Sequence, residues 1–111
     1  MKVVNMTPHV FTKLSESGEV EWLLEGLPED QCPRVSMGEE LSADLGFIVV
    51  KTPTFGEVTN LPEEEAGTLI IVSAMVKEAC PNRHDLVSPG GVVREAGVIK
   101  GARWLLGQQA R

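Results

Sequence analysis

The alternation of apolar and polar residues along the chain predicts mostly short β-strands separated by turns. Residues 2–6 form a first strand. Residues 9–14 and 19–24 flank a Ser-Glu-Ser-Gly turn sequence, and glutamates alternate with apolar residues in the second of these segments. Alternation with period two is typical of half-buried strands, so we expect a hairpin here.

Four further segments have the apolar, β-branched composition of strands. They are residues 47–52, 55–58, 68–72 and 98–106. The run 47–52 is predicted to be a central strand that continues through 55–58, with Pro53 at an edge or a kink. Residues 68–72 are the most apolar, and Gly101 is a possible bulge in the last strand.

One segment departs from this pattern and predicts a short helix. Residues 73–80 contain good helix formers, Ser73 is suited to an N-cap, and Pro81 is a stop signal. Residues 38–45 could form one more helical turn, and Ser-Pro-Gly-Gly at 88–91 is expected to be a turn. We therefore expect a single domain, 1–111, of the α+β class, mostly antiparallel sheet with one short helix after the central strand.

The composition is that of a small globular protein. The chain has 111 residues, of which 42% are hydrophobic and 23% charged, and a net charge of −6. An acidic body opposes binding to DNA, RNA and anionic membranes. The sequence has neither a bilayer-spanning apolar run nor a signal peptide pattern, so we expect a cytoplasmic protein without membrane partners.

The charge is unevenly distributed along the chain. Residues 1–65 hold four basic and thirteen acidic residues, whereas residues 66–111 hold six basic and three acidic ones. Chance segregation of solvated charges is one interpretation. The other is a locally basic patch that would suit a small anionic ligand.

The sequence gives little support to an enzyme. The two histidines, His9 and His84, are not accompanied by a nucleophile elbow, and no glycine-rich phosphate loop is present. Cys80 and His84 have a ligand-like spacing, but no second pair completes a metal site. Cys32 is either activated by the nearby Arg34 or an inert thiol. We expect no cofactor.

Two polar clusters are candidates for binding. In the segment 5–9, Asn5 either fixes a proline turn through hydrogen bonds or faces a ligand together with His9. The segment 81–89 lies in the basic half and is followed by Arg94 and Arg103. Its arginines either bind phosphate or, as an Arg83–Asp85 ion pair, close a loop.

Six segments carry a resemblance to a known family. They are VVNMTPH at 3–9, FGEVTNLPE at 55–63, GTLIIVSAMV at 67–76, NRHDLVSP at 82–89, VRE at 93–95 and VIKGAR at 98–103. These segments resemble a family of small proteins of phages, prophages and bacteria, and the family is similar to the first-described type of phage anti-Thoeris sponge. The resemblance implies a protein that binds a cyclic ADP-ribose isomer made by a bacterial immune enzyme and does not degrade it.

The resemblance also implies dimer-based oligomers with ligand pockets between protomers, some of which bind cyclic oligonucleotides at a separate site. It places Arg94 and Glu95 at the ligand, although the family often has Arg-Asp there. Base stacking would fall to Phe55, Trp22 or Trp104.

The full set of expected ligand-binding residues combines these two lines of argument. It comprises Arg94, Glu95, Arg83, Asp85, Phe55, Asn5, His9 and Arg103. A homo-oligomer is also expected from the residues themselves, because Trp22, Trp104 and Leu105–Leu106 offer more apolar surface than one small sheet can cover. The alternative function is a small structural or protein-interaction module of phage origin.

Overall fold

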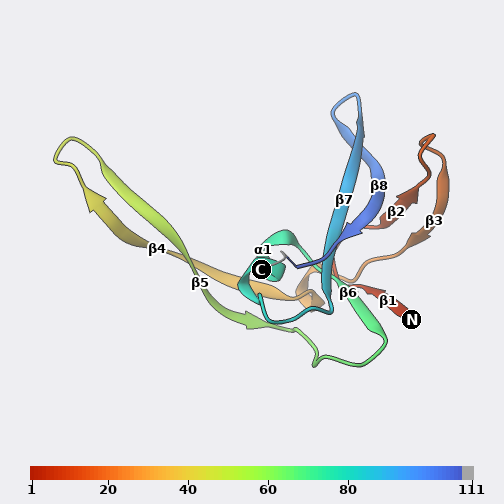
Figure 1. Cartoon of the computed structure of the whole chain (residues 1–111), viewed down its shortest axis with the longest axis horizontal. Coiled ribbons are helices and arrows are strands. Elements are labelled where there is room, and N and C mark those ends of the chain that lie inside the picture. The colour runs from red at the N-terminus through yellow and green to blue at the C-terminus, as the bar shows by residue number, and fades with distance from the viewer. Residues whose placement is uncertain (109–111) are drawn as a thin grey trace.

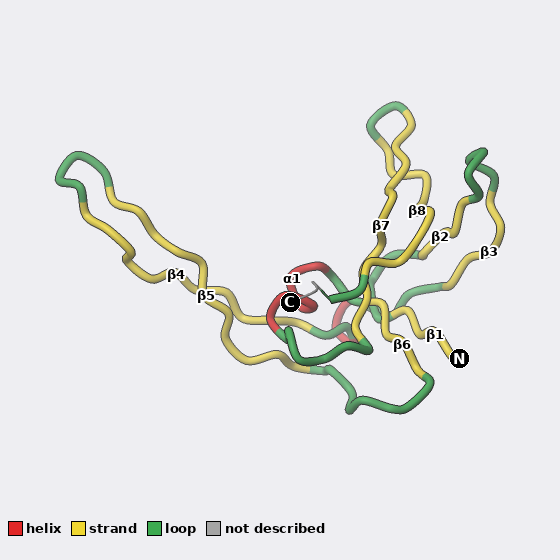
Figure 2. Tube along the Cα trace, viewed as in Figure 1, coloured by secondary structure: helices red, strands yellow, loops and turns green. Residues whose placement is uncertain are grey.

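The computed structural model describes residues 1–108, which form eight strands, one α-helix and one 3₁₀ turn. In chain order the elements are β1 (Lys2–Asn5), β2 (Phe11–Leu14), β3 (Val20–Leu24), η1 (Glu29–Gln31), β4 (Arg34–Asp44), β5 (Val49–Thr59), β6 (Thr68–Ile71), α1 (Ala74–Ala79), β7 (Leu86–Glu95) and β8 (Val98–Leu106). The expected α+β class is confirmed, with mostly antiparallel strands and a single short helix directly after β6 (Figure 2).

Six strands form one sheet in the order β1-β6-β7-β8-β2-β3. The hairpins β2–β3 and β7–β8 are antiparallel, whereas β6 pairs in parallel with β1 and β7. The remaining strands, β4 and β5, form a separate antiparallel ribbon. We call this ribbon, residues 34–59, the arm; it projects away from the two hairpins (Figure 1).

Strand β6 is central because both of its faces are covered. Ile71 and Val87 belong to a cluster on the side of the hairpins, while Ile70 and Leu86 belong to a cluster on the side of the helix. A strand buried on both faces needs a continuous apolar run rather than alternation. The sequence of β6, Thr-Leu-Ile-Ile, meets this need.

Helix α1 lies against β7 and the base of the arm, with Val76 buried beneath it. The Val76 amide donates to the Ser73 hydroxyl at 3.3 Å, and Cys80 is the C-cap residue. The predicted start near Ser73 and end by Cys80 are therefore confirmed. The base of the arm contributes Val35 and Val58 to the cluster around α1.

Two predictions in the middle of the chain are wrong. Residues 38–45 are not a helical turn but lie mostly in β4, and residues 47–52 are not a central strand but the outer part of the arm. Phe47, at the arm tip, is 87% exposed. An apolar run indicates side chains that are favourable to bury, but it does not indicate whether residues of the same chain bury them.

The sequence Ser-Pro-Gly-Gly at 88–91 is not a turn either, because it lies inside β7. Its glycines make room for the Trp104 ring from β8: a Cβ on Gly91 would lie 2.8 Å from that ring, and Gly91 has a φ of +56°. The turn between β7 and β8 falls instead at Ala96 and Gly97, which both have positive φ. That is typical of a tight hairpin turn. The register of this hairpin shifts near Gly101, where a bulge is expected.

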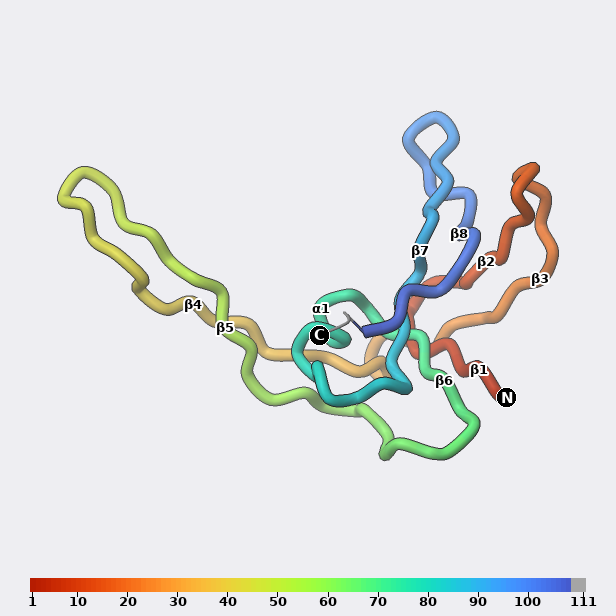
Figure 3. Tube along the Cα trace, in the orientation of Figure 1, coloured from red at the N-terminus to blue at the C-terminus, as the bar shows by residue number. Residues whose placement is uncertain are grey.

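The molecule is extended rather than round. Its radius of gyration is 16.6 Å, against about 13 Å for a compact domain of this length. Figure 3 shows the reason, since the arm leaves the body as an isolated ribbon. Within the described part of the chain, no helix is long and apolar enough to cross a membrane.

Candidate functional site

The turn between β1 and β2 is built around the buried side chain of Asn5. Its amide nitrogen donates to the carbonyl oxygens of His9 (2.9 Å) and Leu24 (3.0 Å). Its oxygen accepts from the Thr7 amide (3.1 Å) and the Thr7 hydroxyl (2.7 Å). The nitrogen and the oxygen of the Asn5 side-chain amide are therefore both engaged in holding the turn. The His9 side chain lies exposed beside it.

Arg83 and Asp85 form a two-pronged ion pair in the segment between α1 and β7. Arg83 Nε and Nη2 donate to the two carboxylate oxygens of Asp85 at 2.9 and 2.7 Å, and Nη2 also donates to the Pro62 carbonyl at 2.9 Å. The Arg83 hydrogen bonds lower the pKa of the buried Asp85 carboxyl, against the opposing effect of burial. The same pair raises the pKa of Arg83. The Arg83 guanidinium thus links the loop at Pro62 to the segment before β7, and its donors on this side are already used.

A shallow hollow of about 390 Å³ lies next to this pair. Its lining includes Glu64, Glu65, His84 and Asp85, together with the N-terminal Met1. Carboxylates on its wall disfavour an anion. The hollow therefore does not suit phosphate, although the basic half of the sequence contributes residues to it.

The outer end of the β7–β8 hairpin presents a different arrangement. Arg94 is exposed there and, among residues 1–108, its guanidinium makes no ion pair and no hydrogen bond. Its neighbour Glu95 lies 3.7 Å from Lys100 across the hairpin. Exposed Val92 and Ile99 surround these charges with apolar surface. This end of the hairpin combines a free guanidinium fork with an uncovered apolar patch, and it is the candidate functional site.

Arg103 lies on β8, on the side of the β2–β3 hairpin. Its Nη2 donates to the Glu16 carbonyl oxygen at 3.5 Å, a long contact. Its Nε is buried and has no hydrogen-bond partner in the described chain. Arg103 is therefore only partly satisfied by contacts among the described residues.

The three aromatic candidates for stacking lie apart from one another. Trp22 packs on Phe11, with ring centroids 5.6 Å apart and a tilt of 43°, and Trp104 covers the glycines of β7. Phe55 lies on the arm opposite Met37, half-exposed. The arm and the β7–β8 hairpin are separate projections (Figure 1), so the fold of the chain does not bring Phe55 to Arg94.

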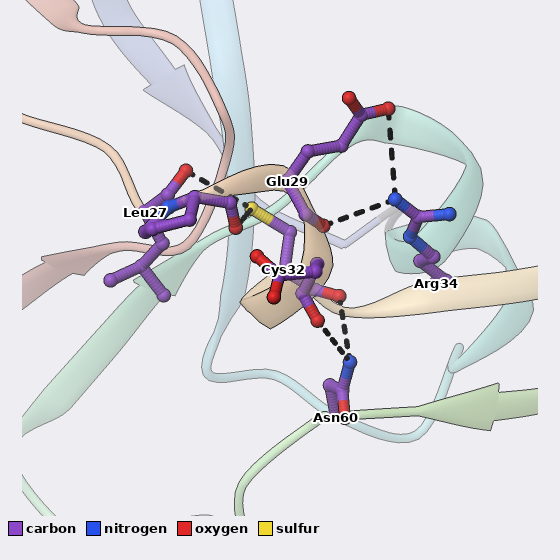
Figure 4. A network of polar contacts seen from close by, with 7 residues as sticks. Leu27, Glu29, Cys32, Arg34 and Asn60 are labelled. Atoms are coloured by element: carbon purple, nitrogen blue, oxygen red, sulfur yellow. Dashed lines mark hydrogen bonds and ion pairs between the residues drawn. The ribbon is translucent and has the colours of Figure 1, made fainter.

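Cys32 is held in a polar network at the base of the arm (Figure 4). Its buried thiol donates to the carbonyl oxygens of Leu27 and Pro28 at 3.7 and 3.5 Å. Arg34 is turned toward Glu29, donating to its backbone oxygen at 3.2 Å, and Asn60 donates to the Cys32 carbonyl at 3.3 Å. This arrangement fits a structural thiol rather than an activated one.

Sequence reasoning missed two residues that fix the helix to the sheet. Lys77 donates to the Ser88 hydroxyl at 2.8 Å and to the carbonyls of residues 106 and 107. The Gln108 amide donates to the carbonyl oxygens of Lys77, Cys80 and Arg83. A lysine in the last turn of a helix is a recognisable signal, whereas nothing in the sequence indicates that a distant glutamine caps the helix end.

Comparisons with known proteins return nothing: no protein-family model matches the chain, and no curated protein and no solved structure is significantly similar to it. Across residues 1–108, no group of three or more His, Cys, Asp and Glu side chains could hold a metal ion.

Proposed function

We propose that this protein binds a small cyclic nucleotide through the outer end of the β7–β8 hairpin and holds it without cleaving it. The expected ligand is a cyclic ADP-ribose isomer, and the role is that of a phage protein that sequesters an immune signal in the cytoplasm of the infected cell. The observation that carries the proposal is the free guanidinium of Arg94 on an exposed, partly apolar hairpin end.

Arg94 differs from the two other described arginines of the basic half in what surrounds it. Arg83 is occupied by Asp85, and Arg103 is partly covered by the β2–β3 turn. A guanidinium fork with no internal partner can form two parallel hydrogen bonds to a phosphate group. Val92 and Ile99 beside it offer apolar contact for a ribose or a base.

A binder of this kind needs few polar groups and a stacking surface, and the hairpin end lacks an aromatic ring of its own. Phe55 offers such a ring from the arm. A pocket shared between protomers, as the family resemblance implies, would combine the arginine of one copy with the aromatic ring of another.

The first experiment titrates a cyclic ADP-ribose isomer into the parent protein and into Arg94 variants by calorimetry. A charged hydrogen bond contributes about 1.5–3 kcal/mol, so Arg94→Ala should weaken binding more than about tenfold. Arg94→Lys should recover only part of the loss, because an ammonium group keeps the charge but not the fork. Arg34→Ala, an exposed arginine at the arm base, is the matched control and should bind as the parent does.

A second measurement separates sequestration from catalysis and from a structural role. The bound nucleotide is released by heating and identified by chromatography and mass spectrometry. Intact nucleotide supports the proposal, whereas an altered product would indicate an enzyme. If the parent does not bind, the proposal is overturned in favour of a structural or interaction module.

A further inference from the structure

We infer that the arm is an assembly element: its apolar face docks on the β7–β8 hairpin of a second copy of this chain, and the second arm docks reciprocally on the first copy. The docking surface includes the hairpin end at Arg94, so in the docked dimer a nucleotide would bind between the two copies; dimer formation itself is tested without ligand. It rests on the register of the arm, on the accessible surface of the chain and on the charges of the two surfaces.

The strand register places the large apolar side chains of the arm on one face. Met37 pairs with Phe55, and Leu41 pairs with Lys51. In a two-stranded ribbon, directly paired residues lie on the same face, and so do residues two positions apart along one strand. Pro53 therefore joins these residues, and a shallow hollow of about 460 Å³ lies between Met37 and Pro53. The opposite face is formed mainly by small and polar residues: Gly38, Glu40, Ser42, Ala43, Val50, Thr52 and Thr54.

Within the described residues 1–108, nothing covers this apolar face. Leu41 is 63% exposed, and the arm and its tip carry eight exposed large hydrophobic residues. They are Met37, Leu41, Leu45, Phe47, Ile48, Val49, Val50 and Phe55. A two-stranded ribbon is at best marginally stable on its own in water. An apolar surface of this extent on such a ribbon therefore requires a partner.

The two hairpins carry an equal number of exposed large hydrophobic residues. They are Val20, Trp22 and Leu23 on β3 and Val92, Val98, Ile99, Trp104 and Leu106 on β7 and β8. An isologous dimer requires two complementary surfaces on each copy. The arm and the β7–β8 hairpin offer such a pair of surfaces.

The surplus of accessible surface has the size of a stable dimer interface. The chain exposes 7729 Å², whereas a compact monomer of 12.0 kDa exposes about 6,000 Å². The excess of roughly 1,700 Å² per chain is within the range that obligate homodimers bury on each subunit.

Net charge favours the hairpin β7–β8 as the docking surface, rather than a second arm. The arm, residues 34–59, holds two basic residues against four acidic ones, and on its apolar face Glu39 lies 3.9 Å from Lys51, so the net negative charge comes from the rest of the arm. The hairpin, residues 86–106, holds Arg94, Lys100 and Arg103 against Glu95. Two arms would meet with like net charge, whereas an arm and a hairpin meet with opposite charge.

The first test measures the oligomeric state by sedimentation equilibrium at micromolar concentration. The parent should be a dimer, and Leu41→Lys should raise the dimer dissociation constant more than about thirtyfold, the effect of losing a hot spot at the centre of an interface. Met75→Lys, which places the same charge on another exposed apolar residue, in α1, is the control and should leave the dimer intact. A monomeric parent, or equal effects of the two variants, would overturn the inference.

The second test reverses charges to establish which surfaces meet. Glu39→Lys and Lys100→Glu should each weaken the dimer, and the double variant should recover affinity because the opposite charges are restored in exchanged positions. If Leu41→Lys and Glu39→Lys disrupt the dimer while Lys100→Glu does not, the arms pack on each other and the arm–hairpin assignment is wrong. Circular dichroism should show an intact body in all variants, because no changed side chain belongs to the buried clusters, whereas the arm of a variant that dissociates should lose part of its strand signal.

Discussion

The arginines of this chain illustrate how the surroundings of one side chain decide what it can bind. Arg83 is bound by a buried carboxylate and a carbonyl oxygen, whereas Arg94 has no partner among the described residues. A guanidinium group that already has hydrogen-bond partners contributes little free energy to phosphate binding, because it must break existing hydrogen bonds to form new ones. Arg83 and Asp85 therefore belong to the stability of the fold and Arg94 to its candidate site.

Replacing Asp85 should reveal the stabilising effect of the Arg83–Asp85 pair. Asp85→Asn should lower the free energy of unfolding at neutral pH by about 2 kcal/mol, since it removes hydrogen bonds between charged groups in a buried setting. Chemical denaturation followed by circular dichroism measures this difference. Glu63→Gln, an exposed carboxylate in the adjoining loop, is the control and should change stability little.

The same pair predicts a pH dependence with a definite sign. The pKa of Asp85 is lower in the folded protein than in the unfolded chain, so its contribution is fully present above the unfolded pKa of about 4. It is lost as the pH falls through the lower, folded pKa. Denaturation curves recorded on the acid side should therefore converge for the parent and Asp85→Asn. A constant difference between them down to the lowest pH would contradict this assignment.

At the scale of the element, α1 is short enough that its cap matters. Ser73→Ala should reduce the free energy of unfolding by about 1 kcal/mol, because the Val76 amide loses its acceptor at the first turn. Ser73→Asp retains a capping oxygen and should remain close to the parent in the same denaturation experiment. Equal loss in both variants would indicate that the hydroxyl contributes something other than a cap.

The elements that the sequence predicts well are those whose partners lie within the chain. The continuous apolar run of β6 and the Ser73 cap with Pro81 after the helix are local signals, and both predictions are confirmed. The run at 47–52 has the same apolar character, but it lies at the outer end of the arm. The composition of a strand indicates that its side chains are favourable to bury. It does not indicate whether the residues that bury them belong to the same molecule.

Long-range packing also accounts for what sequence reasoning missed at the site. The glycines at 90 and 91 resemble turn residues, yet they lie in β7 because Trp104, far along the chain, occupies the space above them. Arg94 and Glu95, which the family resemblance places at a ligand, lie at the hairpin end, while Phe55 and Asn5 lie in other elements. Spacing in a sequence does not show which hairpins share a surface.

At the scale of the whole molecule, the fold divides into a body with a complete core and an arm without one. The two buried clusters meet at β6 and β7, and the arm contributes only its base to them. In the part of the chain that the structure describes, the outer arm therefore has no packing that would hold its apolar face out of water. If two copies associate as proposed, the stability of the arm and the association are two aspects of one equilibrium.

This coupling predicts that thermal stability depends on protein concentration. For a dimer that dissociates as it unfolds, each tenfold rise in concentration favours the folded state by about 1.4 kcal/mol, which should raise the melting temperature by about 3–5 °C for two chains of this size. Calorimetric scans over a dilution series measure this slope. Met75→Lys should reproduce the slope of the parent, whereas Leu41→Lys should melt at a lower temperature that no longer varies with concentration. A parent melting temperature that stays constant on dilution would mean that the arm is stable in the isolated chain, and its exposed apolar face would then have to be explained without a second copy.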